Sequence, residues 1–347
     1  MRFSLLLATL FTSLTAGAQV GGIAAYEFLN LPNSATVAAL GGHHIAVMDD
    51  DLTLAARNPS LLSEAVDGQT VLSHGFLPAG INNSYLAYGR HEEQINTTFQ
   101  AGLQYVGYGS DLVRRDVNGQ DLGSFSASDF ALTVGAARQI EDRLSVGVNV
   151  KAIASQLADY NSLGLGFDLG VHYQDTTGRF QISLLARNFG RQLTHYGDAR
   201  EPMPFELQLG LSRELKYLPF RFSVLYRYLD RWDILYNDPD AVDNFTLIPL
   251  DGEQSTEQGA GALFFDNLVR HFVFSGELFI GKQRNLRARI GYNHGLRREL
   301  RLTDFRSGAG YSFGFAWNTK RFSLAYGRGT YHLGGGVNQL GVSYRVR

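Results

Sequence analysis

One pattern dominates this chain from about Val71 to its C-terminus: segments of roughly ten residues alternate apolar side chains with polar or very small ones. Successive side chains of a β-strand point to opposite faces, so each such segment has one apolar and one polar face. In the clearest segment the apolar face holds Leu163, Leu165, Phe167, Leu169, Val171 and Tyr173, and the other face holds Gly164, Gly166, Asp168, Gly170 and His172. A soluble sandwich buries the apolar face against a second sheet, whereas a membrane-spanning barrel buries it in lipid and keeps the polar face for a hydrated lumen. The repetition of the pattern predicts the barrel.

The first residues have the features of a secretory signal peptide. Arg2 supplies a positive start, residues 5–14 form an apolar stretch, and Ala16, Gly17 and Ala18 form a small-residue cleavage site. A buried N-terminal helix, the alternative, would show an apolar stripe with helical spacing. We therefore assign residues 1–18 to a signal peptide and expect an exported protein. The sequence contains no cysteine, so neither a lipoprotein anchor nor thiol chemistry is expected.

The composition further narrows the class of protein to which this chain could belong. The formal net charge is −2 at pH 7, and binding to nucleic acid requires a basic footprint, so no nucleic acid is expected as a partner. After the signal there is no apolar run of about 18 residues, so no membrane-spanning helix is expected. The abundance of glycine, tyrosine and phenylalanine (39, 17 and 23 residues) suits one large barrel that meets outer-membrane lipid through alternate residues.

The alternating segments predict an all-β fold, a transmembrane antiparallel barrel of about 14 strands. Single-chain bacterial barrels have an even number of strands, and each segment is long enough to cross the hydrocarbon when tilted. The expected strands are about residues 70–76, 84–90, 97–108, 129–140, 143–155, 162–174, 179–188, 204–214, 219–230, 271–282, 285–295, 309–318, 321–328 and 338–346.

The connections between these strands alternate in length, which predicts the orientation of the barrel. Outer-membrane barrels keep tight turns in the periplasm and longer loops outside the cell. The tight turns are expected at residues 141–142, 175–178, 215–218, 283–284 and 319–320, each after an even-numbered strand. The longer loops, expected at residues 109–128, 189–203, 231–270 and 296–308, should therefore be extracellular.

Residues 19–69 differ in character from the barrel, which we assign to residues 70–347. Ser34 is placed to cap a short helix that ends near Leu40, with Gly41 at its C-terminus, and residues 52–56 could form a second helical turn. The simplest expectation is an N-terminal plug of helix and loop inside the lumen. A free periplasmic arm, the alternative, would expose several apolar side chains to water, namely Leu29, Leu31, Val37, Leu40, Leu61 and Leu62.

Strand parity also predicts which charged side chains face the lumen. They are Lys151, Arg187, Arg221, Arg227, Arg287, Arg289 and Arg345, together with Asp168, Glu206 and Glu277. One interpretation of the positive excess is a pocket or passage for an anionic ligand. We favour an interior network of ion pairs, because polar interiors are the rule in such barrels and because the plug offers Asp49, Asp50 and Asp51 as partners. The three aspartates lack the alternate spacing and glycine of a calcium loop, so no metal and no cofactor are expected.

No catalytic residue can be assigned. The nine histidines include His43, His44, His74, His172 and His195, but none lies in a zinc-hydrolase motif such as H-E-x-x-H. Some enzymes are built on membrane barrels, so a barrel hydrolase is one alternative. A lipid-hydrolysis assay would test it. We expect a protein that is not an enzyme.

The expected loop at residues 231–270 is too apolar for a segment that is merely solvated. Such a surface requires a partner or a lid. The residues expected to bind a partner are Trp232, Ile234, Leu235, Tyr236, Phe245, Leu263, Phe264 and Phe265, and the same loop also holds Leu247 and Ile248. A surface scaffold is therefore the favoured function. A transporter of hydrophobic small molecules is the alternative, for which the plug would have to move and a lateral opening would have to exist.

The N-terminal region carries a recognisable string of residues. It comprises Tyr26-Glu27-Phe28-Leu29-Asn30-Leu31-Pro32, Ser34, Ala38-Ala39-Leu40-Gly41-Gly42, Asp49-Asp50-Asp51 and Asn58-Pro59. This string resembles the N-terminal signature of the PorQ family of barrels of the type IX secretion system, within the wider FadL-like group of fourteen-stranded barrels with plugs. The resemblance implies a component that anchors the cell-surface attachment complex and associates with PorZ, beside PorU and PorV. One departure is the C-terminus, which ends Tyr344-Arg345-Val346-Arg347 without the aromatic assembly signal of many barrels.

Overall fold

The structure is a computed structural model, and it describes residues 24–197, 200–234, 260–300, 308–332 and 335–346. The expected signal peptide at residues 1–18 lies outside these described residues.

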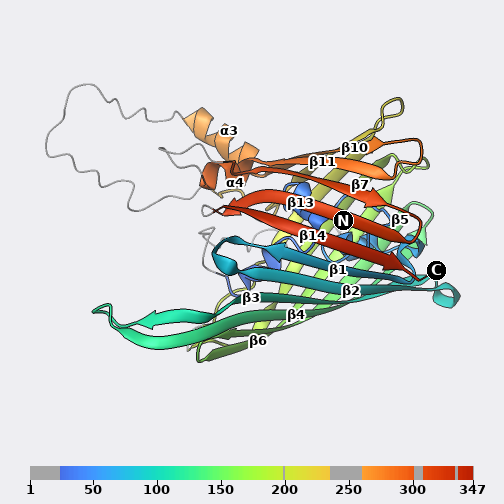
Figure 1. The fold of residues 1–347 in the computed structure, drawn as a ribbon. Coiled ribbons are helices and arrows are strands. Elements are labelled where there is room, and N and C mark those ends of the chain that lie inside the picture. Colours follow the sequence, from blue (N-terminus) through green and yellow to red (C-terminus); the bar gives the residue numbers. More distant parts are fainter. Residues whose placement is uncertain (1–23, 198–199, 235–259, 301–307, 333–334, 347) are drawn as a thin grey trace, which may run out of the picture.

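The described residues contain fourteen antiparallel strands that close into one barrel (Figure 1). Each strand pairs with its neighbours in the sequence, and β1 closes the barrel against β14 through pairs that run from Gln69–Arg345 to Phe76–Asn338. The predicted all-β fold and strand number are confirmed. The strands are β1 Gln69–Phe76, β2 Asn82–Glu92, β3 Thr97–Arg115, β4 Asp121–Glu141, β5 Leu144–Leu157, β6 Tyr160–Gln174, β7 Phe180–Thr194, β8 Glu206–Glu214, β9 Phe220–Tyr226, β10 Phe272–Ile280, β11 Leu286–Asn293, β12 Tyr311–Asn318, β13 Phe322–His332 and β14 Gly335–Arg345.

The two faces of each strand meet different surroundings. In β6, Leu163 and Leu169 point outward with 50% and 56% of their surface exposed, whereas the neighbouring Asp168 is fully buried inside. Exposed leucine, valine, phenylalanine and tyrosine side chains cover the outer wall in the same alternation on the other strands. An apolar outer wall around a closed ladder leaves no backbone group unpaired in lipid, which is the physical requirement for crossing a membrane.

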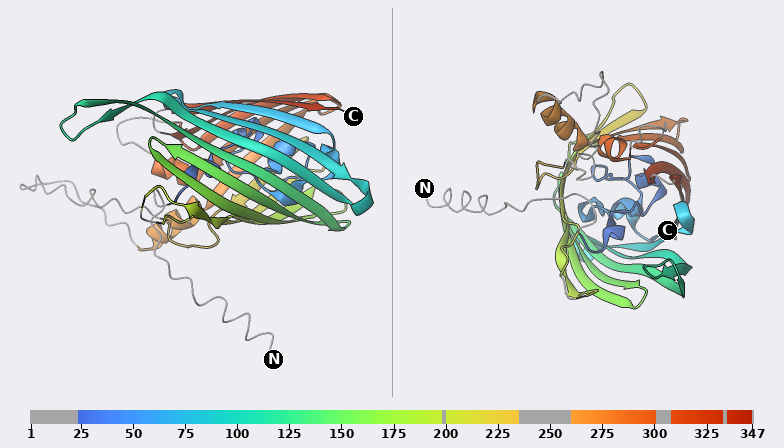
Figure 2. Two further views of the ribbon diagram at one scale, coloured as in Figure 1. Left: turned by 90° about the horizontal axis from the view of Figure 1, so that it is seen from below. Right: turned by 90° about the vertical axis from the view of Figure 1, so that its left-hand side faces the viewer.

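The two ends of the barrel differ. Short connections follow the even-numbered strands and lie at one end, which we call the turn end; the other end is the loop end. At the loop end the wall is uneven, because β3 and β4 extend far beyond their neighbours (Figures 1 and 2).

Two of the expected loops, residues 109–128 and 189–203, were wrong in part. Residues 109–128 form the end of a β-hairpin, in which Leu112 pairs with Phe125, rather than a loop. Asp116 makes the reversal by accepting hydrogen bonds from the amides of Asn118 and Gln120 at 2.9 and 2.8 Å, as side chains of aspartate do in turns. Similarly, β7 continues to Thr194 because its residues still pair with β6.

The helices of the described residues are short. Those at the N-terminus are η1 Glu27–Asn30, α2 Ala35–Ala39, η2 Leu52–Leu54, η3 Pro59–Leu61 and η4 Glu64–Val66; η5 Pro78–Gly80 and η6 Glu93–Ile95 lie in connections, and α3 Ala260–Arg270 and α4 His294–Glu299 lie at the loop end. Among the described residues, no helix has the length and apolar character needed to span a membrane.

Residues 24–68 fold inside the barrel and form a plug, drawn in blue within the ring of strands in Figure 2. Ser34 caps α2 by accepting a hydrogen bond from the amide of Val37 at 3.1 Å, as its position in the sequence predicts. Val37, Leu40 and Leu61 are buried. The barrel thus shields the apolar side chains of the plug from water, whereas a free periplasmic arm would expose them.

Candidate functional site

The plug lies directly against glycines of the barrel wall. A Cβ atom at Gly147, Gly327 or Gly291 would come closer than 3.0 Å to backbone atoms of the plug. At Gly147 these are atoms of Pro59 and Ser60. Interior side chains would hold the plug away from the wall, so the glycines allow a contact between two backbones that other residues would prevent.

Polar side chains of the wall satisfy the irregular backbone of the plug. The Ser312 hydroxyl accepts a hydrogen bond from the amide of Gly41 and donates to the carbonyl of Ala39, both at 2.9 Å. Asn83 donates to the carbonyl of Pro32 at 2.8 Å, and Gln100 donates to the carbonyl of Ala55 at 3.0 Å. These hydrogen bonds give buried backbone groups of the plug the partners that they require. They also join the plug to strands on several sides of the barrel.

Ion pairs join the plug to the barrel near the turn end. Asp49 contacts Arg287 at 2.6 Å and Arg221 at 3.1 Å, and Asp50 contacts Arg287 at 3.3 Å. Glu277 of β10 pairs with Arg289 at 2.8 Å and also with Arg221. Plug carboxylates and barrel arginines therefore form one connected network.

The other charged residues expected in the lumen, except Arg345, have individual partners. Lys151 contacts Asp168 at 2.7 Å, and Arg227 contacts Glu206 at 2.7 Å. Arg187 instead donates to the backbone carbonyl of plug residue Leu29.

Asp51 departs from the expectation that it would pair with an arginine. Its carboxylate accepts hydrogen bonds from the Thr53 amide at 3.0 Å and the Thr36 hydroxyl at 2.7 Å. It is the N-cap of η2, because its carboxylate accepts the hydrogen bond of a free amide at the start of that helix. Asp49 and Asp50 therefore share Arg287, whereas Asp51 has other partners. The described residues hold no group of three or more His, Cys, Asp or Glu side chains that could bind a metal.

The ladder between β7 and β8 is shorter at the loop end than the ladder between β6 and β7. The β7–β8 ladder ends at the pair Arg187–Glu206, whereas β7 continues to Thr194 on its β6 side. At the same level the β6–β7 ladder shifts register. Asn188 there has a φ of 56°, and the buried carboxylate of Asp168 accepts a hydrogen bond from its amide at 2.9 Å. The irregular backbone of this bulge is thus held by a charged group that Lys151 neutralises.

Residues 200–205 lie beside the end of this ladder and form a cover, and the contacts that hold them involve side chains as well as backbone. The carbonyl of Pro204 accepts a hydrogen bond from the Asn188 side chain at 3.1 Å, and the Gln192 side chain accepts one from the amide of Glu201 at 2.9 Å. The amide of Ala25, at the start of the described plug, donates to the carbonyl of Pro202 at 2.9 Å. This cover therefore depends on a few separate contacts instead of a continuous ladder.

A cluster of packed apolar side chains, which we call the apolar cluster, lies behind the cover in the loop-end part of the lumen. Tyr26 of the plug contacts Ser162 at 2.5 Å and stands 6.2 Å from Tyr196, measured between ring centres. The buried residues of the apolar cluster are Ala25, Tyr26, Phe28, Leu29, Val106, Ala131, Ile153 and Met203, with Leu31, Ile81, Tyr108 and Tyr196 packed against them. The sequence analysis did not find this cluster. Strand parity places Val106, Ala131 and Ile153 on the inner faces of their strands, where most side chains are polar. These apolar exceptions were the signal in the sequence that could have predicted the cluster.

The residues expected to bind a partner differ in their exposure in the structure. Trp232, Leu263, Phe264 and Phe265 are exposed at the loop end, where the rings of Trp232 and Phe264 lie 5.0 Å apart. Ile234 is buried instead. Leu235, Tyr236 and Phe245 lie outside the described residues.

A charged contact fixes α3 against α4 beside this aromatic surface. The Asp266 carboxylate contacts Arg298 of α4 at 2.7 Å and Arg270 of α3 at 2.8 Å. Burial by itself raises the pKa of Asp266, but the hydrogen bonds from the two arginines outweigh it and hold the pKa below its usual value.

The comparisons with known proteins support the fold class. The crystal structure of the toluene transporter TodX from Pseudomonas putida is similar with a TM-score of 0.51 and 14% identity, over 90% of this chain and 97% of that one. A FadL homologue from Pseudomonas aeruginosa is similar with a TM-score of 0.50 and 10% identity, over 91% and 98% of the two chains. No protein-family model and no curated protein matches the sequence.

At these identities the similarity shows the fold alone. The fold is that of FadL-like outer-membrane barrels with fourteen strands. It gives no support to the PorQ family in particular, so that resemblance and its partners stay proposals.

Proposed function

We propose that this protein is a non-enzymatic outer-membrane channel for hydrophobic small molecules, with its turn end in the periplasm and its loop end outside the cell. The observation that carries the proposal is the early end of the β7–β8 ladder beside the apolar cluster, to which Met203 of the covering segment belongs. TodX, which shares the fold, is a toluene transporter, and this similarity supports the same class of cargo.

The path we propose is lateral. The plug fills the lumen and is joined to the wall by ion pairs and hydrogen bonds, so a straight passage along the barrel axis would break many contacts at once. The segment at Pro202 and Pro204 is instead held by separate contacts, such as those from the Ala25 amide and the Asn188 side chain, and by the packing of Met203. If it is displaced, a hydrophobic molecule would pass between the apolar cluster and the membrane without crossing water, as its low solubility requires.

The test is uptake of toluene by liposomes that contain the purified protein. The chain has no cysteine, so the pair Gln192→Cys and Glu201→Cys can be joined by a short thiol crosslinker that ties the cover to β7. We expect uptake above that of empty liposomes, a fall of at least about tenfold after crosslinking, which corresponds to 1.4 kcal/mol, and recovery when a reducible linker is cleaved.

The control is the pair Arg114→Cys and Asp159→Cys, which replaces an exposed ion pair of 2.7 Å at the loop end. Crosslinking this pair should leave uptake unchanged. Uptake that survives the crosslink at 192 and 201 would exclude the lateral path, and wild-type uptake no greater than that of empty liposomes would exclude the transporter.

A second function is supported by the exposed aromatic surface around α3. We propose it as a docking site for a surface partner, which by the PorQ resemblance would be PorZ with PorU and PorV. Phe264 and Phe265 expose 57% and 65% of their surface, and aromatic side chains are enriched in protein interfaces. The change Phe264→Ser with Phe265→Ser should abolish recovery of these partners from native membranes, as read by mass spectrometry. Val117→Ser, at a fully exposed position of the β3–β4 hairpin, is the control, and unchanged recovery in the double variant would refute the docking site.

A further inference from the structure

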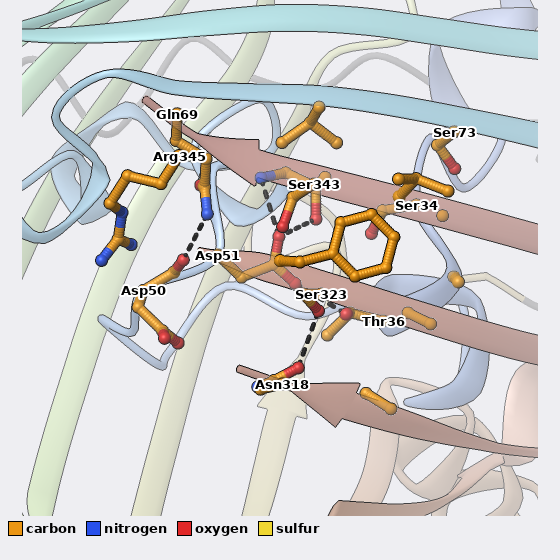
Figure 3. A pocket seen from close by; sticks show the side chains of 18 of the residues that line it. Ser34, Thr36, Asp50, Asp51, Gln69, Ser73, Asn318, Ser323, Ser343 and Arg345 are labelled. Carbon is orange, nitrogen blue, oxygen red and sulfur yellow. Dashed lines mark hydrogen bonds between the residues drawn. The ribbon is translucent and has the colours of Figure 1, made fainter. Parts of the chain in front are cut away.

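A pocket of about 50 Å³ opens at the turn end, between the plug and strands β1, β11, β12, β13 and β14. Figure 3 shows hydroxyl groups from both sides of this boundary gathered around it. They belong to Ser34 and Thr36 of the plug and to Ser73, Ser323 and Ser343 of the strands. The pocket is thus formed only when the plug is in place.

Cations outnumber carboxylates in its lining. The cationic residues are Arg287, Arg289, Lys320, Arg321 and Arg345, and the carboxylates that face them are Asp50 and Asp51. Arg287 and Arg289 are engaged by Asp49, Asp50 and Glu277. Within the described part of the chain, Lys320, Arg321 and Arg345 form no ion pair, while Asp51 is occupied by threonine donors. The lining therefore has an excess of positive charge.

Three guanidinium groups of this pocket also have buried nitrogen atoms without a hydrogen-bond partner. They are Nε of Arg287, Nη1 of Arg289 and Nε of Arg345. Arg289 as a whole is only 4% exposed, so water has little access to its free nitrogen. Buried donors of this kind normally have partners, so an acceptor that reached these nitrogens would satisfy them.

We propose that the pocket binds a small oxyanion group, a phosphate or a carboxylate, between the plug and the last strands of the barrel. Guanidinium groups match the geometry of both, because their N–H donors lie in a planar fork. The serine and threonine hydroxyls supply further donors. Asp50 and Asp51 oppose an anion, but each already accepts hydrogen bonds from cationic or hydroxyl donors, which reduces that repulsion.

This binding would link two parts of the molecule. Ser34, Thr36 and Asp50 belong to the plug, whereas Arg345 and Ser343 belong to β14. A ligand that contacts both groups binds the plugged barrel better than the barrel without its plug, so it stabilises the plugged state by mass action. The site is independent of the proposed lateral channel, because it lies at the opposite end of the lumen.

The test is isothermal titration of inorganic phosphate into the full-length protein in detergent, in a buffer without other oxyanions. We expect saturable binding that weakens by about tenfold or more in Arg345→Gln, since loss of a charge-assisted hydrogen bond has about that effect. Arg213→Gln removes the same charge from an exposed position at the turn end outside the pocket, and it should bind phosphate as the wild type does. If Arg345→Gln fails to form a heat-resistant barrel, Lys320→Gln replaces it, with an expected weakening of about threefold.

Titration of short-chain phosphatidate and of acetate distinguishes the sources of the oxyanion. Tighter binding of phosphatidate than of phosphate assigns the site to a lipid headgroup, and equal or weaker binding assigns it to a free solute. Competition by acetate would show that carboxylates share the site. The proposal is overturned if wild-type protein binds none of the three saturably, or if Arg213→Gln weakens binding as much as Arg345→Gln.

Discussion

Asp49→Asn tests how firmly the plug is held in the barrel. The Asp49 side chain is 19% exposed, and its partners Arg221 and Arg287 are 10% and 12% exposed. Removing one member of a buried ion pair costs about 3–5 kcal/mol, because the remaining charge is left without a partner. Arg221 keeps Glu277, whereas Arg287 keeps only Asp50 at 3.3 Å, whose side chain is 45% exposed. We therefore expect a loss at the lower end, about 3 kcal/mol of the free energy of unfolding.

The measurement is urea unfolding of the protein in lipid vesicles, followed by the fluorescence of its two tryptophans. Asp67→Asn is the matched control, because Asp67 lies in the plug but pairs with Arg90 across an exposed contact of 3.4 Å. It should cost less than about 1 kcal/mol. Adding Arg287→Gln to Asp49→Asn should cost less than the two separate changes together, since the arginine no longer lacks a partner. Equal stability of Asp49→Asn and Asp67→Asn would refute the interpretation that this network holds the plug.

Three further changes test other contacts. Gly147→Val directs a side chain at the backbone of Pro59 and should lower the free energy of unfolding by about 1–3 kcal/mol or more. Ala136→Val on the outer wall is the control and should not lower it. Equal urea midpoints of the two variants would disprove the close contact. Asp266→Asn should increase tryptic cleavage near α3 without changing the urea midpoint of the barrel, and unchanged cleavage would exclude a role for its ion pairs. Because the pKa of folded Asp266 is lowered, its contribution is complete above the unfolded value of about 3.9 and is lost as the pH falls below it. Pepsin should therefore cut wild-type α3 faster from pH 4 to pH 2, and a flat profile would contradict this.

The sequence by itself determined the barrel and the face of each strand. A period of two residues depends only on the geometry of an extended chain, so parity placed Lys151, Asp168 and Glu277 inside before any partner was known. The cap of α2 at Ser34 was predictable for the same reason, because it involves residues only three positions apart.

The tertiary structure decided what depends on contacts between distant residues. The length of β3 and β4 depends on their mutual pairing, and the role of Asp51 depends on the nearest donor among Thr36, Thr53 and the arginines. The end of the β7–β8 ladder at Arg187–Glu206, the apolar cluster beside it and the pocket at Arg345 exist only because the plug and the strands meet in one register. Local periodicity carries no information about such pairings, since register and docking are settled by the free energy of the whole closed barrel.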